Sequence, residues 1–265
     1  MDTIIIAIIS ITLIGAFCAT VLSIAAKVMH VDVDERIVKL ESILPSTNCG
    51  ACGFPGCAGY ASAIVEDSTV KTNLCTPGGE TVVSKISKIM GVEKEDVISK
   101  VAIIHCGGEY EARFRKMDYK GIETCIAATA VHRGENACGF GCLGYGDCLK
   151  ACPSNAICIV KGLARINRNL CTGCGLCVPS CPHKLITIQD TNVQTAMACV
   201  NKERGAIARK KCTRCCIGCK RCARECPERA IVVENDLAII NVERCMRCGH
   251  CADICPTKCI HYFTS

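Results

Sequence analysis

Cysteine is the residue type through which this sequence could do most chemistry, because 28 of its 265 residues are cysteines. Three runs with the spacing Cys-x2-Cys-x2-Cys-x3-Cys-Pro begin at Cys171, Cys216 and Cys245. In such a run the first three thiolates bind one [4Fe–4S] cubane, and the cysteine before proline binds the neighbouring cluster. Zinc sites instead use isolated Cys-x2-Cys pairs in a tetrahedral set. The runs therefore predict iron–sulfur clusters and one-electron chemistry.

The crossing of the fourth cysteine predicts how the runs share their ligands. Each run gives three ligands to one cluster and one ligand to its neighbour. Three complete sets follow from this rule: Cys216, Cys219, Cys222 and Cys255; Cys226, Cys245, Cys248 and Cys251; and Cys152, Cys171, Cys174 and Cys177.

A fourth run is irregular. Shifting residues 125–181 forward by 74 positions places nine cysteines on cysteines, including Cys125 on Cys199, but it places Tyr145 where Cys219 supplies a ligand. Cys138 is the natural substitute in this run. The predicted set is Cys138, Cys142, Cys148 and Cys181. Tyr145 leaves the ligation of this cluster open.

A further four-cysteine unit lies closer to the N-terminus and predicts another [4Fe–4S] cluster. Its ligands are Cys49, Cys52, Cys57 and Cys75. Glycines at positions 50, 53 and 56 would let backbone N–H groups approach the sulfurs, and such contacts tune the potential of a cluster. On spacing alone, zinc remains an alternative here.

Eight cysteines remain after five clusters are assigned. Cys18, Cys158, Cys215 and Cys259 have no partner in the repeat, and we interpret them as packed thiols without a role in ligation. The other four form a complete ligand set for a sixth cluster: Cys106, Cys125, Cys199 and Cys212. The alternative is that these four are buried free thiols. The sequence therefore predicts five or six [4Fe–4S] clusters.

The segments that position these cysteines indicate an α+β fold. We expect a single N-terminal transmembrane helix, a small four-cysteine iron–sulfur domain, and two tandem ferredoxin-like modules with two clusters each. Helical periodicity broken at Gly91 indicates a connecting segment before the modules. The expected boundaries are 1–30 for the anchor, 31–80 for the four-cysteine domain, 81–124 for the connecting segment, and 125–190 and 191–265 for the modules.

The N-terminal segment has the composition of a membrane span. No charged side chain occurs from Thr3 to Ala26, which is about 36 Å of helix at about 1.5 Å per residue. Asp2 is the only charged side chain before this span, whereas Lys27 and Arg36 follow it. The positive-inside bias then places the cysteine-rich part in the cytoplasm, on the inner side of the cell membrane. Structural disulfides are rare in that reducing compartment, which again favours metal.

The net charge of +6 does not indicate a nucleic-acid partner. An oxidised [4Fe–4S] cluster with four thiolates carries a charge of about −2, so five clusters would make the loaded protein acidic overall. Only 4% of the residues are aromatic, which leaves few side chains on which bases could stack. The sequence also lacks a glycine-rich nucleotide loop or a nucleophile motif. We therefore expect electron transfer without a complete substrate-turnover site on this chain.

The order of these units resembles the RnfB family, the iron–sulfur subunits of the Rnf electron transport complex. The resemblance is carried by Asn48 to Cys57, by the segment Cys142-Leu143-Gly144-Tyr145-Gly146-Asp147-Cys148, and by Cys216-Ile217-Gly218-Cys219. It implies one component of a membrane-bound, ion-translocating ferredoxin:NAD oxidoreductase that exchanges electrons with soluble ferredoxin and relays them to partner subunits. Flavin, nicotinamide and ion sites would lie on those other subunits.

Two alternatives remain. One is the iron–sulfur subunit of another membrane oxidoreductase, of the hydrogenase or formate dehydrogenase type. The other belongs to a different class and is a membrane interaction protein whose cysteines bind zinc.

A cluster of basic residues indicates where ferredoxin would dock. Residues 201–224 contain nine basic side chains and one acid, Glu203, whereas the repeat-equivalent residues 127–150 contain two of each. Similar clusters need similar charge compensation, so the excess has another cause, and a basic face would steer an acidic ferredoxin. The predicted docking residues are Lys210, Lys211 and Arg214. A solvated surface or a contact with anionic lipid is the alternative.

Overall fold

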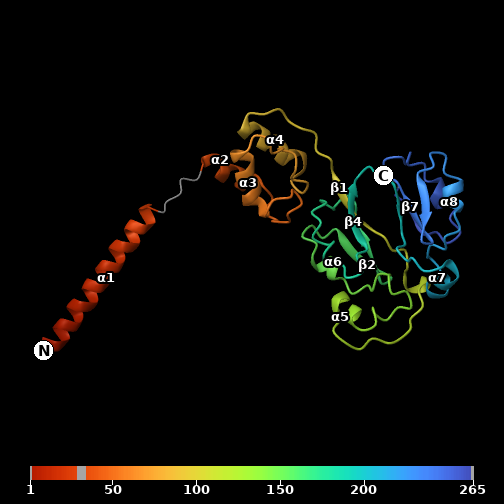
Figure 1. Cartoon of the computed structure of the whole chain (residues 1–265), viewed down its shortest axis with the longest axis horizontal. Helices are drawn as coiled ribbons and strands as arrows, with labels where there is room; N and C mark the ends of the chain where they lie inside the picture. Colours follow the sequence, from red (N-terminus) through yellow and green to blue (C-terminus); the bar gives the residue numbers. More distant parts are fainter. Residues whose placement is uncertain (1, 29–33, 264–265) are drawn as a thin grey trace.

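The computed structural model describes residues 2–28 and 34–263 (Figure 1). These residues form an N-terminal helix, a small helical unit, and two units that are built from short helices and pairs of antiparallel strands. The mixed helix and strand content confirms the predicted α+β class.

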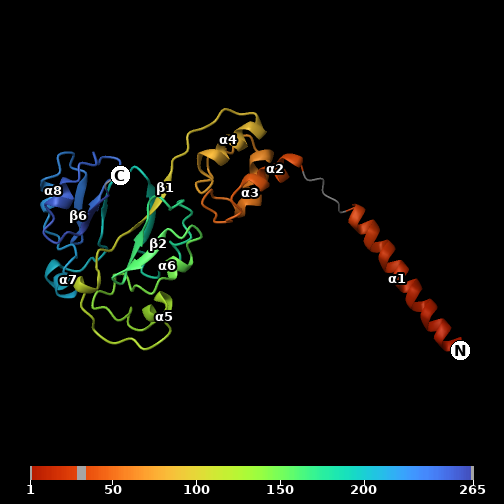
Figure 2. The same cartoon turned by 180° about the vertical axis from the view of Figure 1, so that it is seen from behind.

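Helix α1 (Asp2–Val28) lies apart from the cysteine-rich units in both views (Figures 1 and 2). Its large apolar side chains are exposed, among them Ile11, Phe17 and Leu22. The side chains of residues 2–4, 7, 10 and 28 lie outside the described part of the chain. Within the described part, no helix is long and apolar enough to cross a membrane. The predicted span over residues 3–26 is therefore not supported by the structure.

The helical unit consists of α2 (Glu35–Ile43), α3 (Gly56–Glu66) and α4 (Gly79–Met90). Leu40, Tyr60 and Ile86, one from each helix, are buried in a common core. Helix α4 ends at Gly91, whose positive φ of 68° suits glycine. The unit thus extends beyond the boundary expected at residue 80, because α4 supplies part of its core.

The first module begins with β1 (Lys100–Ile104), upstream of the expected boundary at residue 125. Strand β1 pairs antiparallel with β4 (Ile186–Asp190), and β2 (Ile157–Val160) forms a hairpin with β3 (Leu163–Ile166). Its helices are a 3₁₀ turn (Tyr110–Ala112), α5 (Cys125–Ala130) and α6 (Asp147–Lys150).

The second module repeats this plan. Strand β5 (Thr195–Met197) pairs antiparallel with β8 (Ile260–Tyr262), and β6 (Ile231–Glu234) forms a hairpin with β7 (Leu237–Ile240). Its helices are α7 (Gly205–Lys211), α8 (Arg221–Arg224) and α9 (His250–Asp253).

Strand register shows which residues of the two modules are equivalent. Ile104 pairs with Ile186 in the first module, and Met197 pairs with Ile260 in the second. Ile186 and Ile260 keep the offset of the sequence repeat, whereas Ile104 and Met197 lie further apart along the chain. The first module therefore contains an insertion after β1, and this insertion includes α5.

The segment of residues 112–116, which begins at the end of the 3₁₀ turn, connects the modules through backbone hydrogen bonds. Phe114 donates its N–H to the carbonyl of Lys211 at 3.1 Å, and Ala112 accepts from the N–H of Thr213 at 2.7 Å. On the side of the first module, the carbonyl of Phe114 accepts from the N–H of Ala137 at 2.7 Å. The two modules are thus joined by continuous hydrogen-bonded backbone and not by side chains alone.

Candidate iron–sulfur centres

The N-terminal set lies in two loops of the helical unit. Cys49 and Cys52 precede α3, and Cys57 lies in its first turn. Asn48 accepts the N–H of Cys57 on its Oδ1 at 2.8 Å. A Cβ at position 56 would lie 2.8 Å from that oxygen, and Gly56 has a positive φ of 85°. Glycine is therefore required for the loop to close tightly around these sulfurs.

Cys75 completes this set from the loop before α4. Burial raises the pKa of the Cys75 thiol to about 11, and repulsion from the other three cysteines of the set adds to this effect. Binding to iron would supply the positive charge that offsets this cost of ionisation. Tyr60 fixes the loop, because its hydroxyl donates to the carbonyl of Lys71 at 2.8 Å and accepts from the N–H of Leu74 at 3.2 Å. Tyr60 could not be identified from the sequence, where its only signal is an aromatic residue on a helix between cysteines.

The second module brings together both sets that the crossing rule predicts. Cys216, Cys219, Cys222 and Cys255 line one cavity, with about 330 Å³ of space not filled by protein atoms. In the other set, burial raises the pKa of Cys251 to about 12, with added repulsion from Cys245, Cys222, Cys248 and Cys226. The contribution of Cys222 to that repulsion shows that the two sets are neighbours.

One set of the first module also follows the crossing rule. Burial raises the pKa of Cys177 to about 11, and Cys171, Cys174 and Cys152 add repulsion. Backbone N–H groups point at two of these sulfurs, from Ala102 to Cys171 at 3.4 Å and from Ala156 to Cys152 at 3.3 Å. Bonds of this kind stabilise the negative charge of a reduced cluster.

The irregular set differs from the prediction in one member. The four cysteines that line its cavity are Cys125, Cys142, Cys148 and Cys181, and the cavity has about 410 Å³ of space not filled by protein atoms. Cys125, and not Cys138, accompanies the other three. Tyr145 does not line this cavity, and its ring packs edge-on against Tyr119 with 6.0 Å between the ring centres.

Helix α5 explains this exchange, because it carries Cys125 and is held on both sides of the irregular set. The N–H of Ile126 donates to Asp147 Oδ2 at 3.1 Å, at the start of α6. Thr129 Oγ1 lies 3.4 Å from His183 Nε2, next to the run that ends in Cys181. Because α5 belongs to the insertion of the first module, no repeat pattern could have indicated its position.

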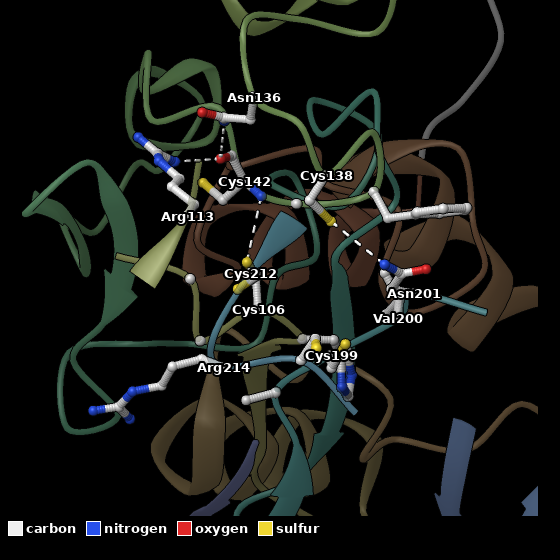
Figure 3. Close-up of a pocket in the computed structure, with 17 residues that line it drawn as sticks. Cys106, Arg113, Asn136, Cys138, Cys142, Cys199, Val200, Asn201, Cys212 and Arg214 are labelled. Atoms are coloured by element: carbon white, nitrogen blue, oxygen red, sulfur yellow. Dashed lines mark hydrogen bonds between the residues drawn. The ribbon is translucent and has the colours of Figure 1, made fainter. Parts of the chain in front are cut away.

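Cys138 lines a different cavity, between the two modules, which we call the junction cavity (Figure 3). Cys106, Cys199 and Cys212 line it as well. The predicted sixth set therefore keeps three of its members, and Cys138 replaces Cys125. Two more cysteines lie in the wall of this cavity: Cys142, which also lines the cavity of the irregular set, and Cys215, which is 1% exposed.

A buried arginine that the sequence analysis missed reaches the same cavity. The side chain of Arg113 donates from Nη1 to the carbonyl of Cys142 at 2.6 Å (Figure 3). It also donates to the carbonyl of Gly162 at 3.2 Å. Its guanidinium lies 4.6 Å from the centre of the Tyr110 ring. Its Nε and Nη2 have no hydrogen-bond partner among the described residues. The positive charge acts on the thiols of both Cys142 and Cys212 and lowers their pKa values, against the larger effect of burial, which raises them.

Cys259, expected to be a packed thiol only, touches a predicted ligand. Its Sγ lies 3.6 Å from Cys255 Sγ, and Cys259 is 2% exposed. The thiol hydrogen bond of Cys259 lowers the pKa of Cys255 to about 5 and that of Cys216 to about 6. A ligating Cys255 is a thiolate and can only accept, so Cys259 is the donor in this contact. The first module has Leu185 at the equivalent position.

Within the described residues, no group of three His, Cys, Asp or Glu side chains is arranged to hold a single metal ion. His105, which also lines the junction cavity, has both ring nitrogens occupied. Its Nδ1 lies 2.7 Å from the carbonyl of Met197, and its Nε2 lies 2.7 Å from Thr187 Oγ1.

Comparison with known proteins agrees with the cysteine pattern. Family models match residues 44–77 as an Fe–S cluster family, residues 164–187 as a 4Fe-4S binding domain, and residues 216–260 as a 4Fe-4S dicluster domain. These matches confirm [4Fe–4S] clusters as the cofactors.

Curated relatives extend the similarity to the whole chain. The B subunit of the Na⁺-translocating ferredoxin:NAD⁺ oxidoreductase complex of Acetobacterium woodii is 41% identical over 240 residues, which are 90% of this chain and 72% of the relative. The B subunit of the proton-translocating complex of Clostridium ljungdahlii is 37% identical over 268 residues, which are 100% of this chain and 94% of the relative. This chain belongs to the RnfB family of the ion-translocating ferredoxin:NAD⁺ oxidoreductase complexes. The B subunit of an ion-translocating oxidoreductase complex of Methanosarcina acetivorans, 36% identical over 93% of this chain, belongs to the same group.

The Rnf family resemblance inferred from the sequence is thereby confirmed. The three family models do not cover four cysteines of the junction cavity. These are Cys106, Cys138, Cys199 and Cys212, which lie outside the matched residues. The same is true of Cys125, Cys142, Cys148 and Cys152.

Replacing Cys259 by alanine should change a potential and not the iron content. A hydrogen bond to a ligand sulfur offsets the charge of the added electron, so its loss should make the cluster of the Cys216 set harder to reduce. One hydrogen bond is worth about 0.5–1.5 kcal/mol, which corresponds to about 20–60 mV for one electron. A redox titration followed by electron paramagnetic resonance measures the shift. Cys158→Ala, on the exposed side of β2, is the control, and equal potentials in both variants would contradict the assignment.

Proposed function

We propose that this chain is the iron–sulfur subunit that passes single electrons between a soluble ferredoxin and the other redox subunits of its complex. The observation that carries this proposal is the presence of cysteine-lined sites in the helical unit and in both modules, so that electrons can enter at one unit and leave at another. The proposed ligand sets are Cys49, Cys52, Cys57 and Cys75; Cys125, Cys142, Cys148 and Cys181; Cys152, Cys171, Cys174 and Cys177; Cys216, Cys219, Cys222 and Cys255; and Cys226, Cys245, Cys248 and Cys251.

The chain's own contribution is to hold thiolates and to surround them with apolar side chains. A [4Fe–4S] cluster supplies the one-electron chemistry, and the surrounding hydrogen bonds and burial set its potential. The N–H of Leu185 donates to Cys181 Sγ at 3.4 Å, as Ala102 and Ala156 do in the neighbouring set. Clusters in neighbouring sets that differ in these contacts can differ in reduction potential. Electrons then move preferentially toward the cluster with the higher potential.

The names of the relatives support the view that different subunits of the complex carry out electron transfer and ion translocation. One relative belongs to a Na⁺-translocating complex and another to a proton-translocating complex, although both are similar to this chain over most of its length. We infer that the coupling ion, the flavin and the nicotinamide are bound by other subunits. The chain would then catalyse the oxidoreductase reaction only as part of its complex.

Anaerobically purified full-length chain tests this proposal. It should be brown, should bleach on reduction by reduced ferredoxin, and should contain at least about 20 irons per chain for five cubanes. NADH should not reduce it unless flavin- and NAD-binding subunits are added. A colourless zinc protein would contradict the proposal. Co-purification with hydrogenase or formate dehydrogenase subunits, and without flavin-binding ones, would favour the alternative complex.

We also propose that the N-terminal segment, whose described part alone does not qualify as a membrane-crossing helix, attaches the chain to the membrane as a single span, with the iron–sulfur units on the cytoplasmic side. The support is the uncharged sequence from Thr3 to Ala26 and the excess of basic residues after it. The exposed apolar side chains of α1 agree with this, because contiguous exposed apolar surface marks an interaction site.

A truncation tests the attachment. The full-length chain, expressed without its partner subunits, should stay in the membrane fraction after an alkaline wash, whereas a chain lacking residues 1–30 should be released. Protease added outside intact cells should leave the modules undigested. Release of the full-length chain, or digestion from outside, would contradict the proposed topology.

We propose further that ferredoxin docks on the basic segment 202–224. Eight of its nine basic side chains are exposed: Lys202, Arg204, Arg209, Lys210, Arg214, Lys220, Arg221 and Arg224. Cys219 in the same segment is also exposed, whereas the other three members of its set are buried. An electron donor bound here would approach that set from its exposed side. Of the predicted docking residues, Lys211 is half-buried and forms an ion pair with Glu203, and Arg214 also lines the junction cavity.

The docking test therefore uses residues that are exposed and do not line the cavity. Charge reversal by Arg209→Glu, Lys210→Glu and Lys220→Glu should slow electron transfer from ferredoxin about tenfold or more at low salt, since steering raises association rates by about 10–10³-fold. The salt dependence of the rate should also weaken, because charges beyond about 8 Å are already screened at physiological salt. Lys85→Glu with Lys88→Glu on α4 is the control. An unchanged rate and salt slope would move the docking site away from α7, and a loss of vesicle binding alone would favour a lipid contact.

A further inference from the structure

The junction cavity has the chemistry of a metal centre that no matched family model covers. We propose that it holds a sixth [4Fe–4S] cluster, bound by Cys106 and Cys138 from the first module and by Cys199 and Cys212 from the second. This inference rests on the proposed electron-relay function and extends it to the contact between the modules.

The four cysteines occupy equivalent positions in the two modules. Cys106 follows the end of β1 by two residues, and Cys199 follows the end of β5 by two residues. The residue before each of these cysteines makes the same backbone hydrogen bond. His105 donates its N–H to the carbonyl of Leu185, and Ala198 donates its N–H to the carbonyl of Cys259, both at 2.8 Å. Cys138 and Cys212 are equivalent through the sequence repeat. Each module therefore contributes the same pair of ligands, and the cavity has approximate two-fold symmetry.

Ligand counting leaves these four cysteines without another site. The second module completes both of its sets without Cys199 and Cys212. In the first module Cys125 takes the place that Tyr145 leaves open, so Cys138 is not needed there. Because Cys125 replaces Cys138 in the irregular set, Cys138 remains available to the junction cavity as a fourth ligand.

The size and walls of the cavity fit the same cofactor. The junction cavity has about 410 Å³ of space not filled by protein atoms. The cavity of the irregular set, hereafter the Cys142 set (Cys125, Cys142, Cys148 and Cys181), has the same volume. Gly108 and Gly141 line it, and an added Cβ at either would lie 3.4–3.8 Å from ligand sulfurs: Cys212 and Cys106 for Gly108, and Cys138 and Cys106 for Gly141. The backbone therefore comes close to the sulfurs, as expected around a cubane.

The polar groups around the cavity are suited to a negative occupant. Arg113 is 8% exposed and has two nitrogens without hydrogen-bond partners in the described part of the chain. A buried guanidinium without a counter-charge is costly, and a thiolate-bound cluster supplies a charge of about −2. The N–H of Cys142 points at Cys106 Sγ at 3.4 Å, and Asn201 Nδ2 points at Cys138 Sγ at 3.9 Å (Figure 3). Both donors would stabilise charge on ligand sulfurs.

The cluster would lie directly between the two neighbouring sets. On one side, Cys142 donates its N–H to Cys106, and its carbonyl accepts from Arg113. On the other side, Cys215 lines the cavity and directly precedes Cys216 in the chain. The sixth cluster would therefore connect the Cys142 set with the Cys216 set and give electrons a continuous path between the modules.

Iron analysis of the full-length chain tests the proposal. The wild-type protein should contain about 24 irons, and the double variant Cys199→Ala/Cys212→Ala should contain about 20, because each cubane holds four irons. Two ligands are removed together so that no partial cluster is retained. Circular dichroism and gel filtration verify the fold. If this variant does not fold, Cys106→Ala/Cys138→Ala removes the same cluster from the other module.

A second step identifies the ligands by combining substitutions. Adding Cys138→Ala to the Cys199→Ala/Cys212→Ala variant should cost no further iron, because the junction cluster is already lost. Adding Cys125→Ala should lower the iron content again, because Cys125 belongs to the Cys142 set. The opposite result would return Cys125 to the junction and overturn the proposed ligands.

Cys215→Ala is the matched control, because Cys215 is a buried cysteine of the same cavity whose equivalent in the first module is Gly141. It should retain all iron, and loss of iron here would make Cys215 a ligand and contradict the proposed set. A wild-type content of about 20 irons that the double variant leaves unchanged would overturn the sixth cluster while leaving the five-site electron relay intact. A wild-type protein without [4Fe–4S] absorption would instead defeat the proposed function itself.

Discussion

The arrangement of this protein depends on the requirement that four thiolates from distant parts of the chain meet around one cluster. The strands are three to five residues long, and the pairs they form are two-stranded, which alone gives marginal stability in water. In the core around the second module, which also includes Ala112 of the first, eight of the fifteen buried residues are cysteines. A core of this kind has little aliphatic area to bury, so metal binding contributes directly to folding, as in other small metal-binding domains.

Local spacing made much of this arrangement predictable. A run such as Cys171, Cys174 and Cys177 places its sulfurs on one short loop, and the cysteine before proline reaches the neighbouring set in both modules. The hairpins β2–β3 and β6–β7, which follow Cys152-Pro153 and Cys226-Pro227, could be predicted for the same reason, since their apolar residues and turns are contiguous in the chain. The membrane span over residues 3–26 was also clear in the sequence, but the described helices do not support it.

The parts that could not be predicted depend on contacts between distant residues. Cys125 joins the Cys142 set because α5 is bonded to Asp147 and lies beside His183, and neither contact has a sequence signal. The sequence repeat holds from Cys138 onward but not before it, because the segment from Cys106 to Cys138 is longer than the segment from Cys199 to Cys212. Cys125 was therefore aligned with Cys199, although the strand register makes Cys106 its equivalent. Arg113, in the same insertion, was missed because a single arginine in a loop does not reveal its burial.

The backbone hydrogen bonds of residues 112–116 have a consequence for the rate of electron flow. Tunnelling slows steeply as the gap between donor and acceptor grows, so a relay works reliably only when its gaps do not fluctuate. A segment bonded to both modules at once prevents them from sliding or hinging at their contact. The insertion that follows β1 thus does more than deliver Cys125: it makes the distance between the two halves of the relay a fixed property of the chain, independent of which partner is bound at either end.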